Sequence, residues 1–65
     1  MYQLTNQEVR VLELICRGYN SKEIGEKLFK SPRTIEGYRA RLYEKLEVKN
    51  KAELIACAFR NDLLK

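Results

Sequence analysis

The sequence predicts an all-α fold of four short helices. Apolar residues recur at intervals of three and four in four separate segments, which is the spacing of helices with one buried face. A residue that caps helix N-termini well precedes each segment. No segment is predicted to form a strand, and the chain contains no internal repeat or long linker. We therefore expect one helical domain over residues 1–65.

The length and composition limit what this domain can be. A chain of 65 residues holds only a small core, for which a net stability of about 3–5 kcal/mol is expected. Apolar residues make up 45% and charged residues 34% of the chain, which is typical of a globular protein. No apolar run approaches the ~18 residues of a membrane span, and no signal-peptide pattern is present. We expect a cytoplasmic protein, or a fragment of one, without a membrane partner.

The first helix is predicted over residues 6–17. Thr5 and Glu8 have the spacing of a capping box, and Leu4 and Val9 can close a hydrophobic staple around it. Gly18 can adopt the left-handed conformation that ends a helix. The predicted apolar face consists of Val9, Val11, Leu12, Leu14, Ile15 and Cys16.

The second helix is predicted over residues 21–28, with Asn20 or Ser21 as its cap. Ile24 and Leu28 are four residues apart and should face inward. Gly25 lies between them, although glycine inside a helix costs about 1 kcal/mol relative to alanine. A close crossing between two helices would explain why glycine is tolerated there.

The third helix is predicted over residues 32–46. Ser31 is a good N-cap, and Pro32 occupies the first helical position, where its missing N–H costs nothing. Because Pro32 pushes the preceding residue out of the α region, the second helix cannot continue into the third. The link is only two or three residues long, which matches a helix-turn-helix. From this spacing and the charge alone, a pair of helices that only pack against each other remains an alternative to a DNA-binding motif.

The third helix has two different faces. Its apolar stripe contains Ile35, Tyr38, Leu42 and Leu46. The opposite face lacks large apolar groups and consists of Arg33, Glu36, Gly37, Ala40, Arg41 and Glu44. A helix that packs along one side and is nearly bare on the other is suited to insertion into another molecule.

The fourth helix is predicted over residues 51–60, after a polar turn in which Val48 is the apolar residue. One apolar row contains Ala52, Ile55, Ala56 and Phe59, and a second contains Leu54 and Ala58. Two rows are wider than one short helix needs for docking on a small core. The extra row predicts either a self-association surface or a wider buried contact. Leu63 and Leu64 could cover the core or dock on another part of a longer chain.

The positive charge is concentrated in the middle of the chain. The net charge is +4, and residues 20–51 carry nine Lys or Arg against five Glu, so they account for all of it. A basic region on one part of a small fold is the electrostatic signature of nucleic-acid binding. Ordinary surface charge is the alternative interpretation.

Residue types argue against an enzyme or a metal protein. The chain has no histidine, no CxxC pair and no glycine-rich phosphate loop, and no base accompanies its Ser and Cys residues. We predict no catalytic residue, no metal and no cofactor. Cys16 and Cys57 lie in apolar helical patterns and are expected to be small buried hydrophobic residues, rather than a disulfide or redox pair.

Three motifs together carry a resemblance to a known family. They are LTxxExxVLxLIxxG from Leu4 to Gly18, EIxxxLxxSxRTI from Glu23 to Ile35, and KLxVxN from Lys45 to Asn50. In this joint spacing the chain resembles the LuxR-type (NarL/FixJ-type) helix-turn-helix domain of bacterial transcription regulators. The resemblance implies the output domain of a longer regulator, often the C-terminal part of a two-component response regulator. It also implies that the third helix is the recognition helix in the major groove and the fourth the dimer helix.

The resemblance assigns roles to particular residues. The positions that face the bases are Arg33, Glu36, Gly37, Ala40 and Arg41. The positions that match backbone contacts are Thr34, Tyr38, Lys22 and Lys45, and Lys30, Lys49 and Lys51 could add phosphate contacts. The dimer positions are Ala52, Ile55, Ala56 and Phe59. The implied partners are double-stranded DNA and a second copy of the chain, with RNA polymerase as a further candidate.

Some residues depart from the family pattern. Tyr38 stands where histidine is common, and its hydroxyl can still bond a phosphate while its ring is half-buried. Glu36 stands where many members have lysine; it can accept from cytosine N4, or pair with Arg33 or Arg39 and orient them. Ala40 can touch a thymine methyl group. Lys30 and Gly25 replace an apolar residue and an alanine.

The sequence therefore predicts sequence-specific binding to duplex DNA as a dimer. Two alternatives stay open. One is a sigma-factor-like promoter-reading domain, which should have a more basic recognition helix and no need for an apolar fourth helix. The other is a helical protein-interaction module that acts through the fourth helix.

Overall fold

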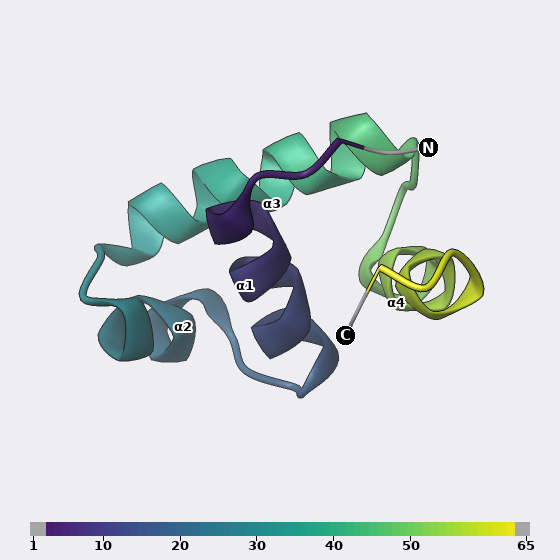
Figure 1. Cartoon of the computed structure of the whole chain (residues 1–65). Helices are drawn as coiled ribbons and strands as arrows, with labels where there is room; N and C mark the ends of the chain where they lie inside the picture. Colours follow the sequence, from purple (N-terminus) through teal and green to yellow (C-terminus); the bar gives the residue numbers. More distant parts are fainter. Residues whose placement is uncertain (1–2, 64–65) are drawn as a thin grey trace.

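The structure, a computed structural model, describes residues 3–63 and shows four helices in that range, with no strand among the described residues. The helices are α1 (Asn6–Cys16), α2 (Ser21–Leu28), α3 (Pro32–Leu46) and α4 (Lys51–Arg60). The all-α prediction is confirmed, and only the end of α1 differs, by one residue. α3 lies across the molecule and contacts the other three helices (Figure 1). None of these helices combines the length and apolar character needed to cross a membrane.

Local hydrogen bonds define where each helix begins. Thr5 and Glu8 form the predicted capping box, with N···O distances of 3.1 and 2.8 Å. Asn20, rather than Ser21, caps α2 and forms a second capping box with Glu23. Ser31 caps α3 through the amide of Thr34, and Asn50 caps α4. Gly18 follows α1 with a φ of 98°, as predicted.

The turn between α2 and α3 explains Gly25. Phe29 ends α2 in the left-handed conformation, and the amide of Lys30 then donates to the carbonyl oxygen of Gly25 at 2.8 Å. A Cβ atom at Gly25 would collide with the carbonyl oxygen of Lys30. The prediction that Gly25 allows a second helix to cross closely is therefore wrong. The group that approaches Gly25 is the backbone of the turn. Gly25 lets the turn fold tightly against α2.

The two glycines inside helices should respond in opposite ways to a larger side chain. We expect Gly25→Val to lower the free energy of unfolding by about 2 kcal/mol or more, because the turn backbone must move. Gly37 has open space around its Cβ position, so Gly37→Ala should raise the free energy of unfolding by up to about 1 kcal/mol. Urea unfolding of both variants checks this. Equal stabilities of Gly25→Val and the wild type would contradict the steric role of Gly25.

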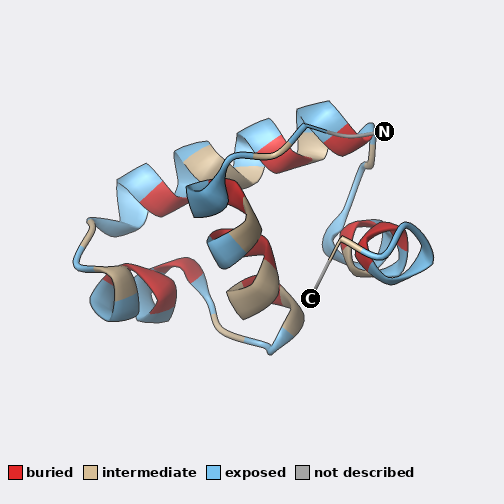
Figure 2. Cartoon of the chain, viewed as in Figure 1, coloured by how far each residue is buried: buried red, intermediate tan, exposed pale blue. Residues whose placement is uncertain are grey.

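The core is built from all four helices, whose buried residues face one another (Figure 2). Its members are Val11, Leu12, Ile15, Ile24, Ile35, Leu42, Leu46, Leu54, Cys57 and Ala58. Val48 and Leu63 pack against it, while Leu64 lies outside the described residues. Cys57 is buried as predicted, and Cys16 is only partly buried; both are free thiols. Burial raises the pKa of the Cys16 thiol.

The two apolar rows of α4 have different environments. Leu54, Cys57 and Ala58 face the core. In the other row Ala52 and Ala56 are exposed, Ile55 is half-buried, and 68% of the surface of Phe59 is exposed. The alternative of a wider buried contact within this chain is therefore wrong. The row of Ala52, Ile55, Ala56 and Phe59 is called the α4 row below, and all of it except the half-buried Ile55 is exposed to solvent.

Candidate nucleic-acid interface

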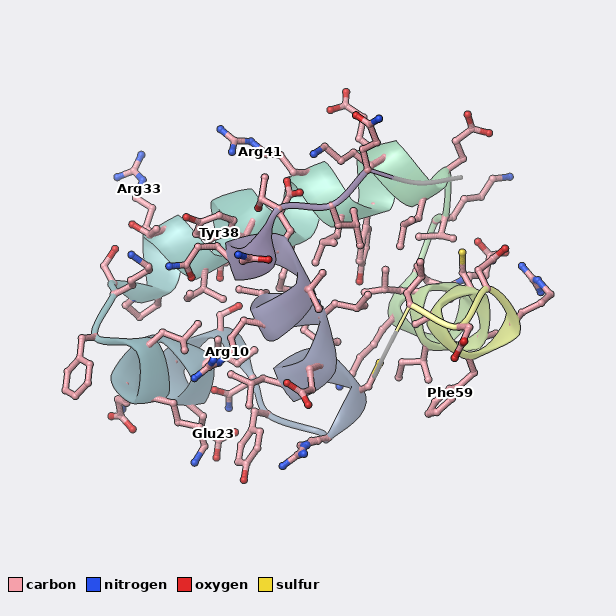
Figure 3. All side chains as sticks on the ribbon, in the orientation of Figure 1. Arg10, Glu23, Arg33, Tyr38, Arg41 and Phe59 are labelled. Atoms are coloured by element: carbon pink, nitrogen blue, oxygen red, sulfur yellow. The ribbon has the colours of Figure 1, made fainter. Side chains whose placement is uncertain are left out.

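One side of α3 is buried and the other faces solvent. Ile35, Leu42 and Leu46 are buried. Every residue that was predicted to face the bases is exposed, namely Arg33, Glu36, Gly37, Ala40 and Arg41. In Figure 3 the labelled Arg33 and Arg41 project from α3 away from α1 and α2. The fold thus brings these side chains together on one solvent-exposed surface, which is called the outer face of α3 below.

Charged side chains on the outer face form no ion pair with any other residue of the described range 3–63. In the part of the chain that the structure describes, ion pairs join only Arg17 to Glu13 and Lys45 to Glu8. The prediction that Glu36 pairs with Arg33 or Arg39 is therefore wrong for this structure. Arg39 instead donates to the hydroxyl oxygens of Ser21 and Tyr43, at 3.3 and 3.4 Å. Glu36 remains available as an acceptor at the outer face.

Two flanks run along α3 beside the outer face. With about 3.6 residues per turn, Thr34, Tyr38 and Lys45 share one side, which we call the Tyr38 flank. Arg39 and Tyr43 share the other, the Arg39 flank, and the hydrogen bond from Arg39 to Ser21 holds the start of α2 beneath it. A helix in the major groove has a sugar–phosphate strand on each side, so both flanks would face phosphates.

The predicted phosphate-binding residues divide between these flanks. Thr34 is exposed on the Tyr38 flank, and its hydroxyl lies 3.0 Å from that of Ser31. Tyr38 is half-buried against the core, as its two predicted roles require. Lys22 is exposed and follows Ser21 directly, at the start of α2. Lys30 is half-buried in the turn before α3.

Lys45 has a structural partner that was not predicted. Its ammonium donates to the carboxylate of Glu8 at 2.8 Å and to the carbonyl oxygen of Gln3 at 3.2 Å. Glu8 is only 1% exposed, whereas the Lys45 side chain is 38% exposed. An ammonium has three N–H donors, so Lys45 can hold Glu8 and still offer one donor to a phosphate. The pair ties the start of α1 to the end of α3.

The environment of Glu8 shifts its pKa. Burial raises the pKa of a carboxyl group, but the hydrogen bonds from Lys45 and Thr5 and the charge of Lys45 outweigh it. The pKa of Glu8 is consequently lowered from its ordinary value of 4.5. A lowered pKa in the folded state means that ionised Glu8 stabilises the fold above pH 4.5. This contribution is lost as the pH falls through the folded-state pKa.

The wild type should therefore lose its stability advantage over Glu8→Gln in acid. Glutamine keeps the capping hydrogen bonds but cannot form the charge pair with Lys45. We expect the wild type to be the more stable protein at pH 7, and the difference to shrink below about pH 4.5. Urea unfolding at several pH values measures this difference. Glu13→Gln, which removes the exposed pair with Arg17, is the control and should differ by less than about 0.5 kcal/mol. If the stability difference between the wild type and Glu8→Gln does not change with pH, the lowered pKa of Glu8 is contradicted.

The start of α4 carries the remaining predicted phosphate residues. Lys49 lies in the turn after α3, and Lys51 is the first residue of α4; both are exposed. The backbone amide of Lys49 donates to the carboxylate of Glu53 at 2.8 Å, which fixes the turn. Both lysines thus extend the basic surface beyond the C-terminal end of α3.

Sequence reasoning missed three groups around this interface. Glu8 was assigned only to the cap of α1, and no spacing rule connects it to Lys45, which lies 37 residues away. Ser21 was considered only as a cap, whereas it is buried and accepts from Arg39. Arg10, at the surface of α1, received no role. The one signal for Glu8 was its placement in an apolar helical face, where an unpaired carboxylate would be costly.

The chain was compared with known proteins. It matches the family described as "Bacterial regulatory proteins, luxR family" over residues 2–58. Oxygen regulatory protein NreC of Staphylococcus carnosus is 43% identical over 61 residues, which are 94% of this chain and 28% of that protein. NreC of Staphylococcus haemolyticus is 41% identical over 61 residues with the same coverage. The chain thus spans about 28% of the length of these curated relatives.

Solved structures show the same fold. The Vibrio cholerae VqmA dimer without its target DNA, a LuxR-type receptor, has a TM-score of 0.92 and 32% identity over 97% of this chain and 28% of that one. A VqmA–ligand–DNA complex has a TM-score of 0.88 and 33% identity over 94% of this chain and 27% of that one. Response regulator ChrA of a heme-sensing two-component system has a TM-score of 0.91 and 26% identity, over 98% of this chain and 32% of that one.

Proposed function

Because this chain belongs to the luxR family of bacterial regulatory proteins, a family of DNA-binding transcription regulators, we propose that it binds double-stranded DNA sequence-specifically as a dimer. In this proposal α3 lies in the major groove, and the α4 row forms the contact between two copies. The chain acts as the output domain of a longer transcription regulator, as the similarity to NreC and to response regulator ChrA supports.

The outer face of α3 is the observation that carries the proposal. It presents two arginines, one carboxylate and two very small residues, with no large apolar side chain among them. The major groove is about 12 Å wide and admits a helix. Arg33 and Arg41 can donate to guanine, Glu36 can accept from cytosine, and Gly37 and Ala40 allow close approach. Cations on both flanks add phosphate contacts that set the register.

A binding titration across salt concentrations tests the proposal. About four phosphate contacts per monomer would give a slope of log K against log salt near −7 for a dimer. Selection of bound sequences from a random DNA pool tests specificity, and we expect it to return paired half-sites. Binding that does not depend on salt, or a pool without enrichment, would contradict the proposal. It would favour the alternative of a protein-interaction module.

The α4 row should control self-association. We expect Phe59→Asn to weaken dimer formation by at least about tenfold, because an aromatic anchor at the centre of an interface often contributes 2 kcal/mol or more. Phe29→Asn is the matched control: Phe29 is 95% exposed but lies in the turn before α3. Asparagine tolerates the left-handed backbone found there.

Sedimentation equilibrium measures this change, supported by the cooperativity of binding to paired half-sites. Dimers of equal strength from the two variants would contradict the role of α4. A promoter-reading domain that acts as a monomer would show no effect of Phe59→Asn on DNA binding.

A further inference from the structure

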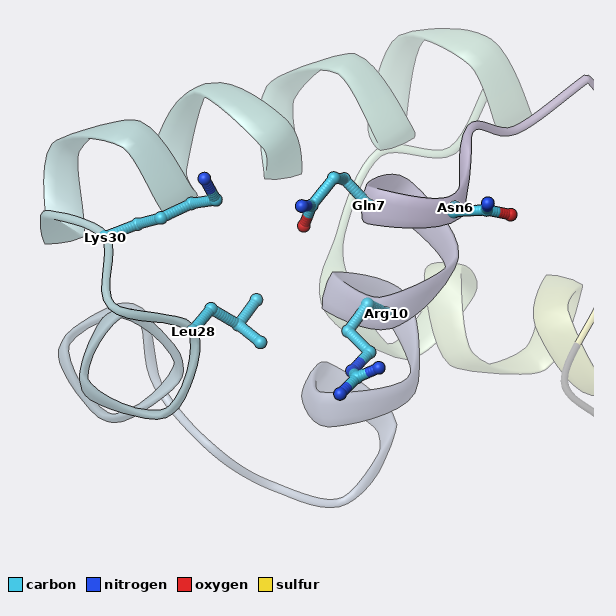
Figure 4. Close-up of a pocket in the computed structure, with 5 residues that line it drawn as sticks. All are labelled: Asn6, Gln7, Arg10, Leu28 and Lys30. Atoms are coloured by element: carbon cyan, nitrogen blue, oxygen red, sulfur yellow. The ribbon is translucent and has the colours of Figure 1, made fainter.

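A polar pocket lies between α1 and the turn that precedes α3. Its volume is about 260 Å³, and it is lined by Asn6, Gln7, Arg10, Leu28 and Lys30. Figure 4 shows that Gln7 and Lys30 extend toward each other beneath α3, while Arg10 lies one turn further along α1. Four of the five lining residues are polar, and they come from two separate segments of the chain. We call this feature the α1 pocket.

The charge of the α1 pocket is positive and unbalanced. Within the described residues, neither Arg10 nor Lys30 takes part in an ion pair. The acidic residue next to Gln7 is Glu8, which is buried and already neutralised by Lys45. The pocket therefore presents two cations and the amide of Gln7 to one small volume. Guanidinium, ammonium and amide groups all carry N–H donors, and such donors lining one pocket favour a phosphate group.

The pocket lies on the side of α3 where one DNA strand would pass. Gln7 directly precedes Glu8, and Glu8 and Gln3 both bind Lys45 of the Tyr38 flank. The start of α1 is thus held beneath the Tyr38 flank, whereas the start of α2 is held beneath the Arg39 flank. A DNA strand that follows Thr34, Tyr38 and Lys45 would pass the mouth of the pocket.

We propose that the α1 pocket binds one phosphate group of the DNA backbone, through Arg10 and Lys30 with Gln7 in support. This inference rests on the proposed DNA-binding function and extends it to α1, a helix outside the helix-turn-helix. α1 then fixes the position of the recognition helix in the groove and carries no sequence information, because every phosphate is alike. Two copies of the domain hold two such phosphates in a dimer.

Variants that remove the charge but keep a polar side chain test the proposal. Arg10→Gln and the double variant Arg10→Gln/Lys30→Gln are compared with Arg17→Gln, which removes one charge at the opposite end of α1. DNA affinity is measured across salt concentrations on a selected and on an unrelated duplex. We expect Arg10→Gln to weaken binding to both duplexes alike, by about 3- to 10-fold. In the double variant, the slope of log K against log salt concentration should become shallower by about 0.9 per monomer, because the pocket holds one phosphate.

The outcomes separate the two proposals. If the wild type does not bind DNA, the proposed function itself fails. If the wild type binds and Arg10→Gln behaves like Arg17→Gln, only the α1 pocket is overturned. A slope change of about 1.8 per monomer in the double variant would mean two separate phosphates and would overturn the shared pocket.

A second arm separates DNA from free anions. NMR titration of the wild-type chain with inorganic phosphate should perturb the amides around Gln7, Arg10 and Lys30 only weakly, whereas DNA should perturb them strongly. Saturable binding of inorganic phosphate, combined with unchanged DNA binding of Arg10→Gln, would make the pocket a site for a free anion and overturn the proposal.

Discussion

Lys45→Met is expected to lower the free energy of unfolding by about 2–3 kcal/mol, most of what a domain of this size has available. The reason is the partner of Lys45. Glu8 is 1% exposed, and the ammonium of Lys45, at 2.8 Å, is the cation that neutralises it. Removing that cation leaves an ionised carboxylate in the interior without a counter-charge, which is costlier than losing the attraction alone.

Urea unfolding of three proteins checks this result. Lys49→Met removes an exposed lysine from the turn after α3 and should change stability by less than about 0.5 kcal/mol. Glu8→Gln/Lys45→Met should recover part of the loss, because the double variant has no buried charge. Equal stabilities of Lys45→Met and Lys49→Met would contradict the structural role of Lys45.

The structural role of Lys45 affects how DNA-binding measurements on its variants are interpreted. Lys45 is proposed to contact a phosphate, and it also holds the start of α1 against α3. A loss of DNA affinity in a Lys45 variant therefore has two physical causes, one of which is unfolding. Lys22 is exposed and has no ion pair among the described residues. Lys22→Ala is consequently the cleaner test of a phosphate contact.

Arg41→Ala is expected to weaken binding to the selected DNA sequence by about 1–3 kcal/mol, which corresponds to roughly 5- to 150-fold. Arg41 projects from the outer face of α3 at its border with the Tyr38 flank, and its guanidinium can donate two hydrogen bonds to one guanine. A base contact exists only on the right sequence. Binding to an unrelated duplex should therefore change much less.

Competition titrations with selected and unrelated duplexes measure this difference. Lys22→Ala is the contrast, because a phosphate contact should weaken binding to both duplexes alike. Repeating the selection from a random pool with Arg41→Ala should relax the preference at one position of each half-site. Arg33→Ala should relax another position. An equal loss of affinity on both duplexes would mean that Arg41 contacts the DNA backbone and not the bases.

The helices and their faces could be predicted because their causes are local. The capping residues Thr5 and Ser31 act on amides within three residues, and both were visible as sequence signals. The outer face of α3 follows from a constant rotation per residue, so its exposed set was predicted correctly. The same rule produced two apolar rows on α4 and had no means to choose which one is buried.

The rest depends on how the helices meet. Glu8 and Lys45 are 37 residues apart, and Ser21 and Arg39 are 18 apart. Such pairs form only after loops have brought the helices into one arrangement, and no spacing along the chain encodes that arrangement. The same holds for Gly25, whose neighbour is the carbonyl of Lys30, and for the α1 pocket, which joins α1 to the turn before α3.

Residues 32–46 thus owe their helical form, their cap and their bare outer face to the local sequence, because hydrogen bonds within a helix connect residues only four apart. Their orientation as a protruding helix, with one flank tied to α1 through Lys45 and the other to α2 through Arg39, comes from packing between helices. Packing sets these contacts because burial of the shared core fixes how the helices dock. The polar pairs then form between groups that docking has brought within hydrogen-bond distance.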